Sequence, residues 1–257
     1  MAEGWTRSVA LEGAFNFRDF GGYPTVDGRA VRRGVLFRSG ALSGLTDADK
    51  RMLATLELSQ FFDLRTTAER ERAEFTLPDT WKTTYRSRDY VMSLGNFRMD
   101  TPDDPDPDEM RVMIDEAYGI LPFEQAPSYR ELLLSIAEGE LPVLVACSAG
   151  KDRTGIFAAV LLDLLGVDRA MVVEDYCASN ASADALWEKF QFLFPTQHPR
   201  RREAWAPMIN CEPRFIQATF NALEKAHGSV KGFCRDVMAV GDDEISAIRR
   251  HLLTDAG

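Results

Sequence analysis

The residues with the clearest potential for chemistry are Cys147 and Arg153, six positions apart in the stretch CSAGKDRTG, residues 147–155. An apolar run from Leu141 to Ala146 precedes this stretch and predicts a strand that is buried on both faces of a parallel sheet. A second apolar run, Ile156 to Leu165, follows it and predicts a buried helix that ends at Gly166. The stretch is therefore expected to form a loop that leaves a strand and enters a helix.

A loop in this position is suited to binding a phosphate monoester. Its backbone N–H groups converge on one point, and the helix dipole adds partial positive charge there. The planar guanidinium of Arg153 can bind two phosphate oxygens, and Lys151 adds a mobile positive charge. The expected phosphate-binding residues are Ser148, Ala149, Gly150, Lys151, Asp152 and Arg153.

In this arrangement Cys147 would lie beneath the phosphorus atom as the nucleophile. The positive field of the loop favours its thiolate, and Thr154 can donate its hydroxyl to the sulfur. This chemistry needs no metal and no other cofactor. A cysteine after a buried strand is commonly a small core residue, but the arginine, threonine and glycine that follow Cys147 favour catalysis. The other cysteines, Cys177, Cys211 and Cys234, are expected to be core or surface thiols.

Other phosphate and hydrolase motifs do not fit the sequence. The pattern G-x-x-x-x-G-K-[ST] fails because Asp152 follows Gly150-Lys151 and Val145 stands at its first position. No G-x-S-x-G or G-x-G-x-x-G turn is present, so the nucleotide-hydrolase and serine-hydrolase interpretations have no anchor. The cysteines form no C-x-x-C pair and the three histidines lie far apart in sequence, which argues against a zinc site.

The composition of the chain further limits the class of protein to which it can belong. The chain has 257 residues and a formal net charge of −10, which argues against a general nucleic-acid-binding protein. No run approaches 18 uninterrupted apolar residues, so no membrane insertion is expected. The first residues lack a basic segment followed by an apolar one, so reduced thiols in a cytoplasmic setting are expected.

The remaining pattern alternates strands and helices and then becomes helical. Short strands and turns are expected over residues 11–45, a helix capped by Thr46 over 47–57, and a strand over 58–65. An acidic loop over 99–110 leads to a helix opened by Asp106-Pro107, and a further helix is expected from Ser128, with Glu131 completing a capping box, to Gly139. Helices are then expected over 169–178, 183–194, 212–226, 229–239 and 243–253. This order indicates an α/β fold with a helical C-terminal third, and no linker divides residues 1–257 into separate domains.

Residues 147–155 resemble the signature loop of the cysteine-dependent protein tyrosine phosphatases, and CxAGKDRTG most resembles their bacterial, atypical dual-specificity branch. Further blocks agree with that branch between about residues 12 and 180. They are NFRDFGGY (16–23), LFRS (36–39), FDLR (62–65) with Glu69-Arg70, EDY (174–176) and SN (179–180).

The resemblance implies a largely parallel central sheet flanked by helices, with the cysteine loop at the carboxyl edge of the strands. It implies attack by Cys147 on phosphorus, a phosphocysteine intermediate held by Arg153, and hydrolysis by water to inorganic phosphate. A general acid must protonate the leaving phenolate. Asp152 is the first candidate, Asp63 the second and Asp89 a weaker third. Asp63 and Asp19 have an equally good alternative, in which they cap loops and pair with arginines.

The sequence departs from the family at Ala146, because the family places a histidine immediately before the nucleophile. That histidine helps to order the loop and to hold the cysteine as a thiolate. Losing such a polar partner costs about 1–3 kcal/mol. We therefore expect a working but slower enzyme with a more alkaline optimum.

A helical lid over the site is expected within residues 183–211. This segment carries Trp187, Phe190, Phe192, Phe194 and Trp205 with Arg200-Arg201-Arg202, although the aromatic residues would equally suit a core.

Phosphotyrosine is the first substrate expected, and phosphoserine and phosphothreonine are additional candidates. Lys151 also suits an inositol phosphate or phosphoinositide, whose crowded phosphates require extra positive charge. A third alternative, suggested by Ala146, is a catalytically weakened pseudophosphatase that binds phosphorylated proteins.

Overall fold

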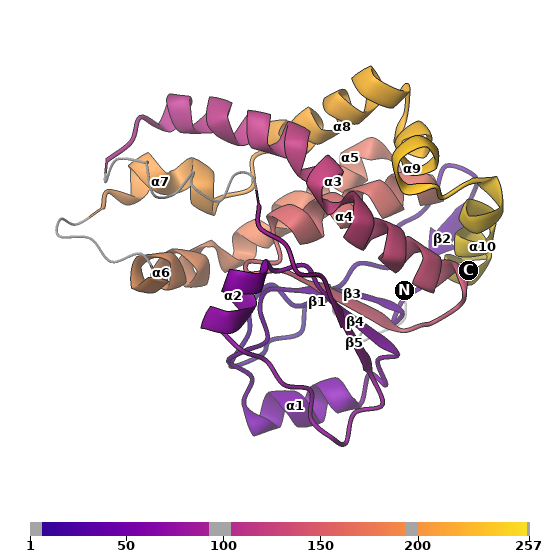
Figure 1. Ribbon diagram of the computed structural model, residues 1–257, viewed down its shortest axis with the longest axis horizontal. Helices are drawn as coiled ribbons and strands as arrows, with labels where there is room; N and C mark the ends of the chain where they lie inside the picture. Colours follow the sequence, from indigo (N-terminus) through magenta and orange to yellow (C-terminus); the bar gives the residue numbers. More distant parts are fainter. Residues whose placement is uncertain (1–6, 93–103, 194–199, 256–257) are drawn as a thin grey trace.

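The computed structural model describes residues 7–92, 104–193 and 200–255 (Figure 1). Its elements in the first half of the chain are β1 (Arg18–Asp19), β2 (Arg29–Val31), β3 (Leu36–Ser39), α1 (Asp47–Ala54), β4 (Gln60–Asp63), α2 (Thr67–Arg72), β5 (Thr84–Ser87) and α3 (Pro107–Ala137). The second half contains β6 (Val143–Ala146), α4 (Asp152–Leu165), α5 (Arg169–Cys177), the 3-10 helix η2 (Ala178–Ser182), α6 (Ala183–Leu193), α7 (Arg202–Ile209), α8 (Pro213–His227), α9 (Val230–Met238), α10 (Asp242–Leu252) and β7 (Leu253–Asp255).

The central sheet has the strand order β1-β3-β6-β4-β5. Strands β3, β6, β4 and β5 are parallel to their neighbours, and only β1 pairs antiparallel, with β3. The expectation of an α/β fold with a largely parallel sheet is therefore confirmed. In Figure 1 the helix α1 lies on one side of this sheet, and α3, α4 and the C-terminal helices lie on the other.

Strand β6 occupies the middle of the sheet and is buried on both faces, which explains its uninterrupted apolar sequence. Val143 and Val145 belong to the large core that the sheet shares with α3, α4 and the C-terminal helices. Leu144 and Ala146 belong to the smaller core on the side of α1. Because side chains alternate along a strand, Cys147 continues the row that faces the large core.

Two expected helix boundaries agree well with the structure. Helix α4 ends at Leu165, where Gly166 adopts a left-handed conformation with φ +84°. Helix α1 begins with the capping box formed by Thr46 and Asp49. It ends at Ala54, three residues before the expected position.

The prediction of a separate helix beginning at Ser128 is wrong. Asp106 caps a helix as expected, but that helix, α3, continues through Pro122 and Pro127 to Ala137. Proline inside a helix removes a backbone hydrogen bond. The burial of the nearby side chains of Ala126 and Tyr129 offsets the free energy lost at Pro127. The Ser128 hydroxyl does not cap a helix but accepts a hydrogen bond from Arg88 Nε at 3.1 Å.

The helical C-terminal third is confirmed with two differences. Helix α7 was not expected as a separate element, and the end of the chain is not wholly helical. Residues Leu253–Asp255 form β7, which pairs antiparallel with β2. Backbone partners from the distant β2 decide this pairing, so local sequence does not reveal it.

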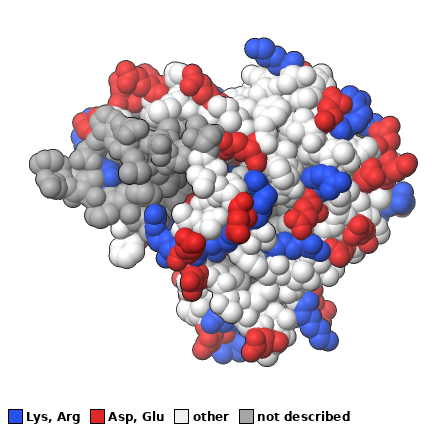
Figure 2. All heavy atoms as spheres, in the orientation of Figure 1, with Lys and Arg blue, Asp and Glu red and all other residues white. Residues whose placement is uncertain are grey.

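Acidic and basic side chains alternate over the face shown in Figure 2, without a continuous basic area among the described residues. No helix in the described ranges is both long enough and apolar enough to span a membrane. Within the same ranges, no group of three or more histidine, cysteine, aspartate or glutamate side chains could hold a metal ion.

Candidate active site

The loop of residues 147–151 lies at the carboxyl edge of the sheet, between the end of β6 and the start of α4. Cys147 is buried directly after β6, and Arg153 is the second residue of α4. Gly150 has φ +65°, and a Cβ there would come within 2.5 Å of the Ser39 backbone. Only glycine therefore lets the loop approach β3 so closely.

Two side chains bind the outer side of this loop. Asn16 Nδ2 donates to the carbonyl oxygens of Ala149 at 3.1 Å and Gly150 at 3.0 Å, and Arg38 Nη2 donates to the Gly150 carbonyl at 2.8 Å. In a trans peptide the N–H points away from the carbonyl. The N–H groups of Gly150 and Lys151 are therefore directed to the opposite side of the loop, as a phosphate-binding site requires.

Arg38 is itself fixed by a buried ionic network. The Asp175 carboxylate accepts from Arg38 Nη1 at 2.5 Å, from Arg18 Nε at 3.5 Å and from the Tyr23 hydroxyl at 3.2 Å. Burial opposes ionisation of Asp175, but the charges of Arg38 and Arg18 outweigh it and hold its pKa below the usual range. Several sequence blocks thus converge behind the loop, although they are far apart in the chain.

Arg153 is held by Glu69, which completes the capping box of α2. Its Nη1 and Nη2 atoms lie 2.6 and 2.8 Å from the two Glu69 carboxylate oxygens, and Nη1 also donates to the Leu64 carbonyl at 3.0 Å. Ser148 Oγ donates to Glu69 Oε1 at 2.5 Å. Burial opposes ionisation of Glu69, but Arg153 outweighs it and keeps the Glu69 pKa well below its usual range.

The role of Glu69 was missed at the level of sequence, where it appeared only as part of a similar block. The sequence nevertheless contains a pattern that points to this role of Glu69. Thr66 and Glu69 form a T-x-x-E capping box immediately after the strand β4. Such a box at the carboxyl edge of a parallel sheet places a carboxylate near the loop that follows the neighbouring strand.

Asp152 and Lys151 face the helices rather than the outer surface of the loop. The Tyr118 hydroxyl donates to Asp152 Oδ1 at 2.5 Å, and Lys151 Nζ lies 3.1 Å from the same oxygen. Lys151 Nζ also donates to the Met208 carbonyl at the end of α7 at 3.0 Å. Lys151 is thus almost fully buried and ties the loop to α7.

Thr154 is fully buried near the start of α4. Its hydroxyl has no hydrogen-bond partner within the described part of the chain. A buried hydroxyl without a partner costs free energy. The Thr154 hydroxyl can therefore donate a hydrogen bond to a neighbouring group that becomes negatively charged during a reaction.

The other candidate carboxylates have partners of their own. Asp63 accepts from Arg65 through both oxygens, at 3.0 and 2.7 Å, and from the Tyr85 hydroxyl at 2.8 Å. Asp19 accepts from the backbone N–H groups of Gly21 at 2.7 Å and Gly34 at 2.6 Å. Asp89 is exposed and paired with Arg70. Asp19 therefore binds backbone N–H groups of two loops, and Asp63 pairs with an arginine.

Ala146, Ser39 and Asp63 share one row across the sheet, because Ala146 is in register with Ser39 on β3 and with Asp63 on β4. Paired residues on parallel strands point to the same face. Ala146 packs into the smaller apolar core, and the Ser39 hydroxyl beside it is buried without a hydrogen-bond partner among the described residues.

The segment 183–211 forms α6 and α7, with a small aromatic core between them. Trp187, Phe190 and Trp205 are buried, and the Phe190 ring centroid lies 5.9 Å from Trp187 and 4.9 Å from Trp205. Phe192 is exposed, and Phe194 lies outside the described residues. Of the arginines in this segment, Arg200 lies over the Phe190 and Trp205 rings, Arg201 pairs with Asp104 and Arg202 pairs with Asp184.

Helix α6 also brings Lys189 close to the nucleophile loop, a residue not singled out from the sequence. Its Nζ lies 5.1 Å from the centroid of the Phe15 ring, which packs against Gly40 at the end of β3. Burial and the charge of Arg65 lower the Lys189 pKa, whereas electrostatic interactions with Cys147 and Glu69 oppose that shift. Lys189 is thus a partly buried amine within electrostatic reach of Cys147.

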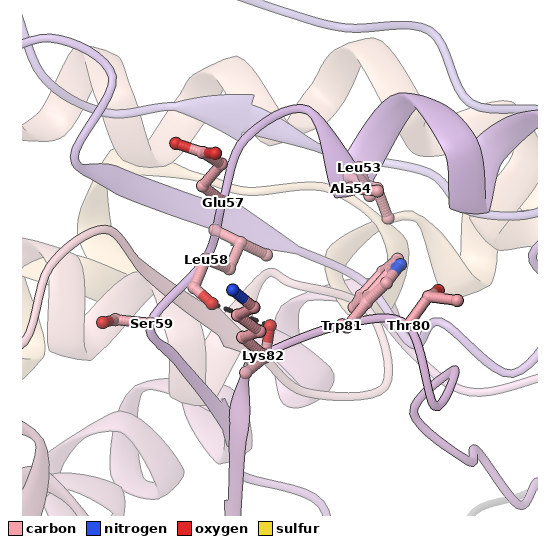
Figure 3. Close-up of a pocket in the computed structure, with 9 residues that line it drawn as sticks. Leu53, Ala54, Glu57, Leu58, Ser59, Thr80, Trp81 and Lys82 are labelled. Carbon is pink, nitrogen blue, oxygen red and sulfur yellow. Dashed lines mark hydrogen bonds between the residues drawn. The ribbon is translucent and has the colours of Figure 1, made fainter.

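A separate hollow of about 360 Å³ lies at the opposite, amino edge of the sheet. Figure 3 shows Trp81 below the end of α1, with Leu58 and Lys82 beside it. Ser59 and Thr83, which line it, directly precede β4 and β5. Catalytic loops in parallel sheets lie at the carboxyl ends of the strands, so this hollow is separate from the Cys147 loop.

Comparison with known proteins agrees with this geometry. The sequence matches the tyrosine phosphatase family over residues 9–254. It is 28% identical over 250 residues to a protein of Cupriavidus necator that is named as a tyrosine-protein phosphatase, covering 95% of this chain and 88% of the relative. It is 27% identical over 264 residues to the triple specificity protein phosphatase PtpB of Mycobacterium tuberculosis, covering 88% of this chain and 92% of that protein.

The chain therefore belongs to the tyrosine phosphatase family, and its strand–loop–helix unit places Cys147 and Arg153 at the carboxyl edge of the sheet. The resemblance noted from the sequence is thereby confirmed. Among solved structures, a crystal structure of P. aeruginosa TpbA matches with 20% identity and a TM-score of 0.33, covering 67% of this chain and 81% of that one. That likeness is too distant to bear on activity.

Proposed function

We propose that this protein hydrolyses phosphotyrosine through a phosphocysteine intermediate on Cys147. The observation that carries the proposal is the placement of Cys147 directly after the central strand, with Arg153 on the first turn of α4 and the loop N–H groups between them. These groups surround one point at a helix N-terminus, where a phosphate dianion is favoured. No cofactor or metal enters the proposed reaction.

The first step is attack of the Cys147 thiolate on phosphorus. The S–P bond forms as the bond from phosphorus to the phenolic oxygen breaks, and a carboxylic acid gives its proton to the leaving oxygen. In the second step water attacks phosphorus and gives a proton to the same carboxylate. The S–P bond breaks, which releases inorganic phosphate and restores the thiolate.

Arg153 binds the phosphoryl group while Glu69 fixes its orientation. A guanidinium has five N–H donors, and Glu69, the Leu64 carbonyl and the Tyr90 hydroxyl take only part of this set. The remaining donors suit two equatorial oxygens of the phosphoryl group, where charge develops in the transition state. The unpartnered Thr154 hydroxyl suits the sulfur when Cys147 is the leaving group.

Asp152 is our first choice as general acid. It is the first residue of α4 and its side chain is 29% exposed, whereas that of Asp63 is 1% exposed and bound by Arg65 and Tyr85. Asp19 is held by two backbone N–H groups, and the Asp89 carboxylate pairs with Arg70. Asp152 thus combines membership of the loop with access to solvent.

The test is turnover of an aryl phosphate across pH 5–9 by the parent protein and by Cys147→Ser. We expect turnover by the parent, none by the serine variant, and a phosphorylated cysteine when the parent is quenched in acid during turnover. A serine variant as active as the parent would refute the cysteine mechanism. Arg153→Lys is expected to lose most activity, since lysine lacks the planar fork.

Phosphoinositides and inositol phosphates form the alternative substrate class. The observation in favour is Lys151 in the loop, and one relative is named as a triple specificity phosphatase. Against it, Lys151 Nζ is bound by the Met208 carbonyl and by Asp152, so it must leave both to reach a second phosphate. A panel of phosphotyrosine, phosphoserine and phosphothreonine peptides with inositol phosphates separates these classes. A weakened, phosphate-binding pseudophosphatase would bind these ligands without turnover.

We further propose that residues 1–257 act as one phosphatase domain in which α6 and α7 form a lid. The family match over residues 9–254 supports one domain. The hydrogen bond from Lys151 to the Met208 carbonyl of α7 and the electrostatic interaction of Lys189 of α6 with Cys147 support the lid. The lid predicts that vanadate slows proteolytic cleavage within residues 183–211, and unchanged cleavage would argue against it.

We also propose a cytoplasmic location for the protein. The free thiols of all four cysteines are consistent with it.

A further inference from the structure

We propose that Tyr118 is a positioning residue for the Asp152 carboxyl and that it acts through a buried chain of hydrogen bonds that continues to Tyr176. The inference rests on the proposed function, with Asp152 as the general acid. It assigns a role to two residues that lie outside the loop of residues 147–151, on α3 and on α5.

The geometry fixes Tyr118 on both sides. Its hydroxyl lies 2.5 Å from Asp152 Oδ1 and 2.6 Å from the Tyr176 hydroxyl. The Tyr118 ring is almost fully buried, packs edge-on against the Tyr176 ring at 5.9 Å, and lies 5.7 Å from the Phe215 ring. A ring held in this way cannot rotate its hydroxyl away from Asp152 without disturbing the core.

The protons in this chain can point only one way when Asp152 is ionised. A carboxylate is only an acceptor, so Tyr118 donates to Asp152 and Tyr176 must then donate to Tyr118. Both hydroxyls therefore favour the ionised form of Asp152.

The chain also determines which carboxyl oxygen carries the transferable proton. Tyr118 and Lys151 Nζ both contact Oδ1 of Asp152. The proton of the carboxylic acid is therefore directed to Oδ2, and the position of Oδ2 follows from the position of Tyr118. The titratable and charged groups around Asp152 include Lys151 from the loop, Tyr118 and Tyr129 from α3, Tyr176 from α5, and Cys211.

Tyr118→Phe removes the hydroxyl and keeps the ring. The carboxylate loses a donor, so its protonated form is favoured, and a general acid then remains active to higher pH. We expect the alkaline limb of kcat to move up by about half to one pH unit. We also expect kcat to fall about three- to tenfold for an aryl phosphate with a basic leaving phenolate, and to change little for one with an acidic phenol.

The experiment compares these pH profiles for the parent, Tyr118→Phe, Tyr176→Phe and Ser135→Ala, with thermal unfolding of each variant. Ser135 is the matched control, because it is a buried hydroxyl on the same helix but donates to Glu140 Oε2 at 2.6 Å, away from Asp152. Its removal is expected to leave the position of the alkaline limb unchanged. Tyr176→Phe removes the next donor and is expected to shift the limb in the same direction as Tyr118→Phe, by less.

An alkaline limb and a leaving-group dependence equal to those of the parent in Tyr118→Phe would overturn the inference. If Tyr118→Phe does not fold, an alkaline limb and a leaving-group dependence in Tyr176→Phe that equal those of the parent would overturn the inference instead. Asp152→Asn with an unaltered dependence on the leaving group would also overturn it, since Asp152 would not be the acid. The proposed cysteine mechanism fails separately, on an active Cys147→Ser.

Discussion

At the scale of single residues, the salt bridge between Arg153 and Glu69 is the contact that most constrains the site. Both side chains are largely removed from water, and two parallel N–H···O contacts join them. Removing one partner of a buried pair leaves an uncompensated charge. Glu69→Gln is therefore expected to lower the free energy of unfolding at pH 7 by about 3 kcal/mol and to reduce kcat/KM about tenfold.

The same pair predicts a pH dependence. The folded-state pKa of Glu69 lies below its ordinary value of 4.5. Its contribution to stability is therefore fully present above pH 4.5 and is lost as the pH falls through the lower folded-state pKa. The stability difference between the parent and Glu69→Gln, measured by urea unfolding, should shrink below pH 4.5. Glu71→Gln, an exposed position on the same helix, should show little difference at any pH.

The alanine before the nucleophile is the second feature at this scale. Ala146 lies in one row with Ser39, whose buried hydroxyl has no partner in the described residues, and with Asp63. A histidine at 146 would offer Ser39 a hydrogen bond and support the loop from beneath. Ala146→His is expected to turn over an aryl phosphate several-fold faster at pH 5–6, even though the added volume costs about 1–3 kcal/mol of stability.

The control is Ala146→Leu, which adds similar bulk without a polar atom. Equal rates for the histidine and leucine variants at low pH would show that hydrogen bonding at this position does not limit the reaction. Activity that appears only in Ala146→His would identify the chain as a disabled phosphatase.

At the scale of elements, α7 and α6 affect two lysines of the site region in different ways: α7 binds Lys151 of the loop, and α6 carries Lys189. Lys151 is tied to the end of α7 and is neutralised by Asp152. Lys189, by contrast, has its Nζ over the Phe15 ring and interacts electrostatically with Cys147 and Glu69. We therefore expect its charge to attract an incoming anion.

Lys189→Met is expected to raise KM for an aryl phosphate about fivefold with little change in kcat. One charge at a few ångströms in a partly buried site is worth about 1 kcal/mol, and it acts before the chemical step. Steady-state kinetics at low and high salt provide the measurement, because the difference between parent and variant should narrow at high salt. Lys225→Met, on the exposed side of α8, is the matched control. A drop in kcat at unchanged KM would contradict a role in binding.

At the scale of the whole molecule, the buried network around Asp175 joins the sheet to the helical layer. Arg18 comes from β1, Arg38 from β3 and Asp175 from α5, and Arg38 continues to the Gly150 carbonyl. The network therefore couples the packing of the two layers to the shape of the nucleophile loop.

Asp175→Asn is expected to destabilise the fold by about 3–5 kcal/mol, since two buried guanidinium groups would lose their shared carboxylate. Thermal or urea unfolding measures this loss. The variant should also bind inorganic phosphate more weakly, because the loop loses part of its support. Asp236→Asn, at an exposed pair on α9, should leave both quantities nearly unchanged. Equal stability of the two variants would contradict the structural role of the network.

The arrangement of the site could be predicted from sequence where its parts are local. The strand β6, the loop and α4 form one continuous segment, and their apolar runs with Gly166 define its limits. The capping residues Thr46 and Asp106 were identified for the same reason. The start expected at Ser128 failed because local capping signals were outweighed by the burial of α3 against other helices.

The sequence by itself determined the family, and it predicts Cys147 as nucleophile with Arg153 beside it, because all these residues lie within nine consecutive positions. Only the tertiary structure decided which side chains act on that loop. Glu69 is 84 positions from Arg153, and the two meet because β4 lies beside β6 in the sheet. Tyr118 and Tyr176 are 58 positions apart, and they meet because α3 and α5 both pack beside α4. Such pairs depend on the order of strands and the packing of helices, which no local pattern of residues encodes.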